Sequence, residues 1–195
     1  MYKRQRTGKG SVTDDAEAVA RTLDGDLDAY AGLVTRYTAV AHRAAVLAGA
    51  GEDAEDVVQE AFVKAFRKLG TFRGGEPFRP WLLRIVVNET SNLRRSLGRR
   101  GGAVRRFALR LVPADRVDGP EVDVLVTHRR EALLAAVATL PDKDRLVLTC
   151  RYFLDLSEAE TAQVLGWPVG SVKSRTARAL GRLRAVVPRE EVSDA

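Results

Sequence analysis

The chain has 195 residues and a formal net charge of +6, from 32 lysines and arginines against 26 acids. This length allows one medium domain or two small ones, and a hydrophobic fraction of 45% is enough for packed cores. The basic balance favours an acidic partner, with nucleic acid first and an anionic membrane surface second.

The residue inventory excludes several classes of protein. A single cysteine, Cys150, excludes an intramolecular disulfide framework and indicates a reducing compartment. No apolar run approaches the roughly 20 residues that a membrane span needs, and no cluster of His and Cys has zinc spacing. We therefore expect a cytoplasmic protein without membrane insertion, metal site or cofactor.

No group of residues indicates catalysis. Cys150 lies in an apolar helical stripe, and neither His42 nor His128 is near it in the sequence. A buried structural thiol is therefore expected there instead of a nucleophile. The glycines near the N-terminus lack the P-loop pattern, and we predict that the chain is not an enzyme.

Helical periodicity runs through most of the chain, and no convincing strand pattern appears. It predicts helices over residues 14–23 and 27–48, then a third helix with Asp53 as N-cap, and a fourth from about Pro80 to residue 97. The third helix is expected to bury an apolar stripe of Val58, Ala61, Phe62, Ala65, Phe66 and Leu69. Further helices are predicted over residues 124–140 and again after Pro141.

The interval between the two helical parts has a different composition. Residues 98–120 are rich in Gly, Pro and Arg, which predicts a linker, with a short helical piece at 104–111 as an option. The expected fold is all-α, with two small helical domains, residues 14–97 and 124–187, joined by a flexible basic linker, residues 98–123. Residues 1–13 and 188–195 are expected to be tails.

Charge is segregated along the chain. Residues 94–110 carry seven arginines and no acid, and residues 173–189 carry six positive charges and no acid. Residues 52–60 carry five acids and no base. Solvated helix faces would explain any one block, but the three together favour at least two kinds of partner.

The strongest local motif lies near the C-terminus. Ser157 and Glu160 have the spacing of a capping box that opens a short helix, and Gly166 supplies a turn. The next helix, from about residue 170, has an apolar face and a basic face. This arrangement is typical of a helix-turn-helix, whose second helix enters the DNA major groove. An ordinary helical hairpin with a charged exposed face is the alternative.

Ordered motifs in both halves extend this pattern. They are residues 23–37 (Leu-Asp-Gly-Asp, then Tyr30, Leu33 and Tyr37), residues 52–62, residues 72–88 and residues 140–184. Together they resemble the bacterial RNA polymerase sigma factors of the sigma-70 superfamily, specifically the extracytoplasmic-function (group IV) type. In that comparison residues 52–62 resemble region 2.2, residues 72–88 resemble regions 2.3 and 2.4, and residues 140–184 resemble region 4.

The resemblance implies roles for residues of the first half. Region 2.2 of the family docks on a coiled coil of the polymerase β′ subunit, and the matching residues here are Asp53, Asp56, Gln59, Glu60 and Phe62. Phe62 alternatively belongs to the core.

Regions 2.3 and 2.4 of the family recognise the −10 promoter element as it opens, and the loop at residues 74–78 resembles the one that receives a flipped base. Phe72 and Trp81 are alternatively core residues. The matching candidates are Phe72, Arg73, Gly75, Phe78, Trp81, Arg84, Asn88, Asn92 and Arg95.

Region 4 of the family recognises the −35 element. The resemblance implies base contacts from Lys173, Ser174 and Arg178, and phosphate contacts from Ser171 and Arg175. Thr161 stands where the family usually has an apolar residue, which is expected to soften the packing of its helix.

The predicted function is therefore that of a sigma factor, which binds core RNA polymerase through the β′ coiled coil and the β flap and directs initiation at promoter DNA. An anti-sigma factor is a common further partner in the family. The alternative is a stand-alone helix-turn-helix regulator that binds DNA as a dimer. An adaptor that binds only protein would leave both basic faces unused.

Overall fold

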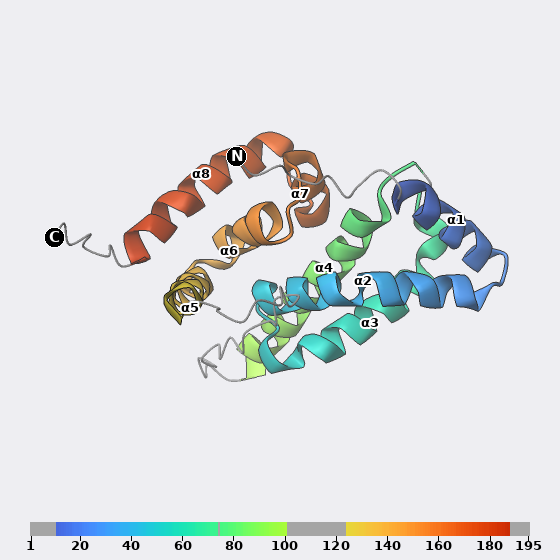
Figure 1. Cartoon of the computed structure of the whole chain (residues 1–195), viewed down its shortest axis with the longest axis horizontal. Coiled ribbons are helices and arrows are strands. Elements are labelled where there is room, and N and C mark those ends of the chain that lie inside the picture. The colour runs from blue at the N-terminus through green and yellow to red at the C-terminus, as the bar shows by residue number, and fades with distance from the viewer. Residues whose placement is uncertain (1–10, 74, 101–123, 188–195) are drawn as a thin grey trace.

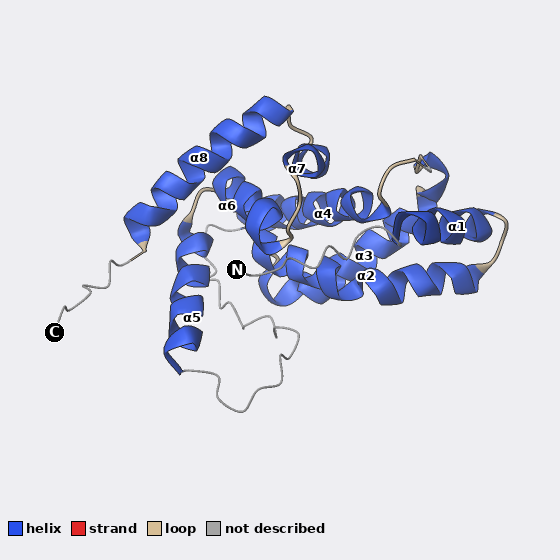
Figure 2. Cartoon of the chain, turned by 45° about the horizontal axis from the view of Figure 1, so that its top comes forward, coloured by secondary structure: helices blue, strands red, loops and turns tan. Residues whose placement is uncertain are grey.

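The computed structural model describes residues 11–73, 75–100 and 124–187. Within these ranges every regular element is helical, and the helices form two groups that lie against each other (Figures 1 and 2). The prediction of an all-α chain with two helical units is confirmed. The possible helical piece at residues 104–111 lies outside the described residues.

The first group contains α1 (Ser11–Leu23), α2 (Leu27–Ala48), α3 (Ala54–Arg67) and α4 (Phe78–Arg100). Short 3-10 turns, η1 (Gly51–Asp53) and η2 (Leu69–Thr71), connect three of them. Asp26 caps α2, because its Oδ1 accepts hydrogen bonds from the backbone N–H groups of Asp28 and Ala29 at 3.0 and 3.1 Å. Gly49 ends α2 in the left-handed conformation, with φ of 106°.

The second group contains α5 (Val124–Thr139), α6 (Asp142–Leu148), a π-helical turn η3 (Thr149–Phe153), α7 (Glu158–Leu165) and α8 (Val169–Val186). The predicted capping box is present. Ser157 Oγ accepts from the Glu160 N–H at 3.2 Å, and Glu160 Oε2 accepts from the Ser157 N–H at 2.7 Å. Gly166 takes the left-handed conformation, with φ of 68°, and turns the chain into α8.

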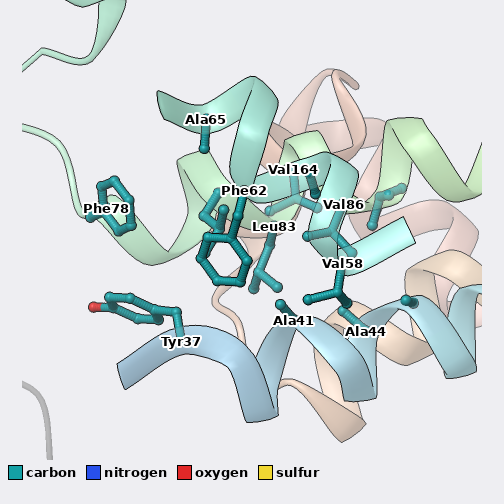
Figure 3. Packing of buried hydrophobic residues seen from close by; sticks show 14 of the residues in the cluster. Tyr37, Ala41, Ala44, Val58, Phe62, Ala65, Phe78, Leu83, Val86 and Val164 are labelled. Atoms are coloured by element: carbon teal, nitrogen blue, oxygen red, sulfur yellow. The ribbon is translucent and has the colours of Figure 1, made fainter. Parts of the chain in front are cut away.

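The core of the first group lies between α2, α3 and α4 (Figure 3). Small residues of α2, such as Ala41 and Ala44, are fully buried and let Val58 of α3 pack closely. Because interiors are packed at crystal-like density, this alanine-rich seam fixes how near the helices lie. The same core positions the outer faces of α3 and α4.

The two groups share this core. Leu154, Leu156 and Val164 of the second group, together with Cys150, are buried in the same apolar cluster as Leu83 and Val86 of α4. A smaller cluster beneath α8, with Val172 and Ala179, belongs to the second group alone. The sequence predicts two domains on a tether, whereas the structure packs α7 along α4 and η3 against α2.

Three local predictions need correction. Phe66, predicted to face the core, is 43% exposed, and Val57 is buried in its stead. Asp53 takes the N-cap position of α3 but makes no capping hydrogen bond through its side chain. Helix α4 continues to Arg100, three residues beyond the predicted end.

Candidate functional site

The predicted acidic surface lies on the outer side of α3. Asp56, Gln59 and Glu60 are exposed and follow one another at helical spacing, and Asp53 is half-buried in the preceding turn η1. Phe62, by contrast, is buried among the core residues of the first group, so its placement favours the core alternative.

Two apolar side chains extend this surface toward the C-terminus of α3. Val63 and Phe66 are 45% and 43% exposed, and they continue the face of Asp56 and Gln59 at i+4 and i+7 spacing. The ring of Tyr30 on α2 supports Phe66 edge-to-face, with centroids 5.0 Å apart. The sequence pattern predicts no role for Val63 and a buried position for Phe66. The sequence does contain a signal that Phe66 is exposed, because a buried stripe on α3 is already complete without it. That stripe consists of Val57, Val58, Ala61, Phe62 and Ala65.

The aromatic candidates for the −10 element form one cluster at the start of α4. The ring of Phe78 lies 5.5 Å from that of Phe72 and 5.4 Å from those of Trp81 and Tyr37. Phe78 is fully buried and Phe72 nearly so, while Trp81 is half-buried. Phe78 therefore offers no surface to DNA in this arrangement and instead supports the loop before α4. For Phe72, burial favours the core alternative.

The polar candidates for the −10 element are brought together on α4. Arg84, Asn88, Asn92 and Arg95 are all exposed and follow a single stripe along the helix. Arg95 donates to Asn92 Oδ1 at 2.6 Å, which holds two members of the stripe side by side. In the loop that leads into α4, Arg73 and Gly75 are also exposed.

Helix α7 lies against the N-terminal part of this stripe. Gln163 donates to Glu76 Oε2 at 2.9 Å, and Nη2 of Arg84 approaches within 3.9 Å of the position that a Cβ would take at Gly166. Arg79 donates to the carbonyl oxygen of Leu154 at 2.6 Å. The two groups of helices are thus in contact, and we call this the closed arrangement. It brings the helix-turn-helix up to one end of the candidate −10 surface.

The candidate −35 residues belong to α8, which lies at the edge of the molecule (Figure 1), and the solvent-exposed side of this helix is its outer face. Ser171, Lys173, Ser174 and Arg178 are exposed, whereas Val172 and Ala179 on the opposite face are buried. This face has the composition and the helix-turn-helix setting of a major-groove surface.

Arg175 is placed differently from its neighbours. It is half-buried, its Nη1 lies 3.3 Å from Asp144 Oδ1, and its guanidinium lies 5.5 Å from the centre of the Trp167 ring. Its proposed phosphate contact stays a prediction, which would require it to leave both partners.

Two buried hydroxyls lie in the second group. Thr161 on α7 and Thr149 in η3 are fully buried, and neither hydroxyl has a hydrogen-bond partner within the described residues. The predicted softening of α7 at Thr161 therefore has a physical basis, since an unpaired buried hydroxyl destabilises the fold.

Two other kinds of site are absent from the described ranges. No group of three or more His, Cys, Asp or Glu side chains is placed to hold a metal ion there. No helix in these ranges combines the length and apolarity that crossing a bilayer demands.

Comparison with known proteins agrees with this layout. The family described as Sigma-70 region 2 matches residues 29–100, and the one described as Sigma-70, region 4 matches residues 130–183. The ECF RNA polymerase sigma-E factor of Escherichia coli strain K12 is 34% identical over 184 residues, covering 85% of this chain and 90% of the relative. The chain belongs to the extracytoplasmic-function group of the sigma-70 family. The resemblance inferred from the motifs is thereby confirmed.

A second curated relative and two solved structures also match most of the chain. The ECF sigma-E factor of Haemophilus influenzae is 33% identical over 174 residues, covering 86% of this chain and 92% of the relative. The structure of CnrH in complex with the cytosolic domain of CnrY superposes with a TM-score of 0.64 at 28% identity, covering 88% of this chain and 96% of CnrH. The sigma factor RpoE of Bartonella quintana, solved with the anti-sigma factor NepR, superposes with a TM-score of 0.66 at 22% identity. The match covers 80% of this chain and 95% of RpoE, which shows the shared fold.

Proposed function

We propose that this sigma factor binds core RNA polymerase and directs it to bipartite promoters, with region 4 on a −35 element and region 2 on a −10 element. The observation that carries the proposal is the presence of both family regions beside an acidic face on α3. Each region has a polar or basic face whose composition suits DNA binding. Acids in a DNA-binding chain would repel DNA but suit a basic protein partner. The function is non-enzymatic and belongs to the cytoplasm, where the polymerase acts.

The face of α3 is the proposed contact with the β′ coiled coil. Asp56, Gln59 and Glu60 would meet basic and polar groups, and the exposed rings and methyls of Phe66 and Val63 would supply apolar contacts. Interfaces usually gain most of their affinity from a few buried apolar or aromatic groups with a polar rim. The acids then set orientation and association rate.

The stripe on α4 is the proposed −10 surface. Arg84 and Arg95 would contact phosphates, while Asn88 and Asn92 have the amide groups that recognise base edges. Because α7 lies against the start of this stripe, promoter recognition requires the two groups of helices to separate. Core polymerase would hold them apart.

The outer face of α8 is the proposed −35 surface. Lys173 and Arg178 have the donors that guanine O6 and N7 accept, and Ser174 suits either a base or a phosphate. A stand-alone dimeric regulator would use this face too, but it would leave the region 2 match and the acidic face of α3 without a role.

A protein partner that holds the free sigma factor is also proposed. CnrH, which is 28% identical to this chain, was solved with the cytosolic domain of a second protein. An anti-sigma factor is therefore the expected partner when core polymerase is absent.

The test is run-off transcription with purified core polymerase, the full chain and a genomic promoter library. We expect transcripts from a small set of templates only when the chain is present, and we expect the chain to co-purify with core. Unselective transcripts, together with failure to co-purify, would refute the proposal.

A further inference from the structure

Asp144 is a buried carboxylate beneath the proposed −35 helix. It is the third residue of α6, and its side chain is 2% exposed. Its Oδ1 lies 3.3 Å from Nη1 of Arg175, and its Oδ2 accepts a hydrogen bond from Nη1 of Arg182. Both arginines belong to α8, so one buried acid on α6 contacts two basic side chains of the proposed DNA-binding helix.

The pairing is needed for the fold, because a buried carboxylate without a partner is strongly unfavourable. It also restrains α8. Arg175 and Arg182 are seven residues apart and lie on one side of the helix two turns from each other, so a carboxylate that contacts both fixes the rotation of α8 over α6. Val172 and Ala179, buried in the cluster beneath α8, restrain the same rotation through packing.

Arg178 lies between these two arginines at i+3 and i−4 spacing, and it behaves differently. It is exposed, and the hydrogen bond recorded for its side chain goes to the carbonyl oxygen of Ser174 within α8, at 3.3 Å. No ion pair with an acid is found for it within the described ranges. Of three arginines along one stripe, the outer two are therefore held by Asp144 and the middle one faces solvent.

We propose that Asp144 is a positioning residue for −35 recognition. It keeps Arg175 and Arg182 away from DNA phosphates and sets the angle at which Lys173 and Arg178 enter the groove. Phosphate contacts carry no sequence information, whereas base contacts do. Asp144 thus lowers non-specific affinity and preserves discrimination between sequences. This inference rests on the proposed function and assigns phosphate contacts to fewer residues than the family resemblance implies.

The inference predicts a specific salt dependence. Each phosphate contact on duplex DNA contributes about 0.9 to the slope of log affinity against log salt. If Asp144 holds Arg182, then Arg182→Gln removes a positive charge without removing a phosphate contact. Arg182 is 57% exposed, and Asp144 keeps its pair with Arg175 when Arg182 is replaced, so this substitution does not leave the buried carboxylate without a partner.

The experiment uses holoenzyme reconstituted from core polymerase and the full chain. Its binding is measured over a range of salt concentrations, to a selected promoter and to the same duplex with a scrambled −35 element. We expect Arg182→Gln to leave the salt slope at the wild-type value, whereas Lys173→Gln should lower it or reduce discrimination between the two duplexes. A slope smaller by about 0.9 for Arg182→Gln would place that arginine on a phosphate and overturn the inference.

Asp144→Asn is the complementary variant, because it releases both arginines at nearly constant side-chain volume. We expect its slope to steepen by up to about 1.8 and its affinity for the scrambled duplex to rise several-fold, so that discrimination falls. Asp144→Glu should restore the wild-type values. Asp155→Asn is the charge-matched control, since Asp155 is exposed in the same half and its left-handed conformation, φ 48°, suits Asn.

Equal behaviour of Asp144→Asn and Asp155→Asn would overturn the inference. Circular dichroism checks that Asp144→Asn is folded, and if it is not, the slope of Arg182→Gln decides. Wild-type holoenzyme that discriminates between the two duplexes supports the proposed function regardless of how Asp144→Asn behaves. Failure of the proposed function and failure of the inference about Asp144 are therefore distinguishable.

Discussion

Nη1 of Arg94 lies 2.7 Å from Oδ1 of Asp142, and this ion pair joins α4 of the region 2 half to α6 of the region 4 half. Together with the hydrogen bond from Arg79 to the Leu154 carbonyl, it adds polar contacts to the apolar core that the two halves share. The closed arrangement therefore depends on contacts that both halves supply.

The Arg94–Asp142 pair predicts a dependence on acid. Burial raises the pKa of Asp142, but the hydrogen bond and charge of Arg94, with those of Arg145, outweigh it and hold the pKa below its ordinary value of 3.8. A lowered carboxyl pKa stabilises the fold above the ordinary value, and this stability is lost as pH falls through the lower folded value.

Urea unfolding of wild type and Asp142→Asn, over a pH range on either side of 3.8, measures this contribution to the free energy of unfolding. Because the carboxylate is largely exposed, we expect wild type to be more stable by at most about 1 kcal/mol above pH 3.8, with the difference shrinking at lower pH. A difference that stays constant into acid would contradict this assignment.

Cys150 reports on separation of the halves. Burial raises the pKa of its thiol to about 12 from an ordinary value of 9.0, so the free chain should react slowly with thiol reagents. Because Cys150 is buried in the core that both halves share, separation should expose it and raise the thiolate fraction by up to about 1,000-fold.

The measurement is the labelling rate of the Cys150 peptide by mass spectrometry, with and without core polymerase. We expect core to accelerate labelling, and Arg79→Gln, which removes a contact between the halves, to accelerate it without core. Identical rates with and without core would show that the halves do not separate at this surface.

Thr161 predicts a stabilising substitution. Its buried hydroxyl has no partner in the described ranges, and removing an unpaired hydroxyl recovers the free energy of its desolvation. Thr161→Val should raise the free energy of unfolding by about 1 kcal/mol in urea denaturation.

Thr90 is the matched control, because it is also fully buried but its hydroxyl donates to the Val86 carbonyl at 2.9 Å. Thr90→Val is therefore expected to give no gain. Equal gains at Thr161 and Thr90 would mean that the missing partner at Thr161 is not the cause.

The exposed apolar residues of α3 predict where core polymerase gains affinity. Phe66→Ala should weaken binding of core by about tenfold or more, and Val63→Ala by less, because an aromatic side chain buries more area on binding. Both side chains are largely exposed in the free chain, so the melting temperature should change little.

Tyr152→Ala is the control for this pair, since Tyr152 is a large exposed side chain in the other half. Fluorescence titration of labelled chain with core gives the affinities. An unchanged affinity for Phe66→Ala would remove α3 from the proposed contact, and an equal loss for Tyr152→Ala would mean that the loss is not specific to α3.

The sequence predicted the features that depend on neighbouring residues. The Ser157–Glu160 capping box and the turn at Gly166 act within one turn of chain, and the helix boundaries that they imply lie close to those observed. The exposed faces of α4 and α8 followed from helical spacing in the same way.

What the sequence did not predict depends on contacts between distant segments. Leu154 and Val164 have the same apolar character whether they pack within region 4 or against α4, so the shared core had no local signal. The position of Phe66 was ambiguous, because the choice between Phe66 and Val57 depends on which way α3 faces α2 and α4. The pairing of Asp144 with two arginines of α8 spans 31 and 38 residues.

The proposed −35 face of α8 and the proposed −10 face of α4 are expected to act in the same initiation event. The measurement is run-off transcription by holoenzyme on one selected promoter, with its −35 and −10 elements replaced in turn. We expect initiation to be lost when either element is replaced and restored when both return at their original spacing. Initiation that survives replacement of the −10 element, or binding of the −35 element equally well without core polymerase, would contradict this expectation.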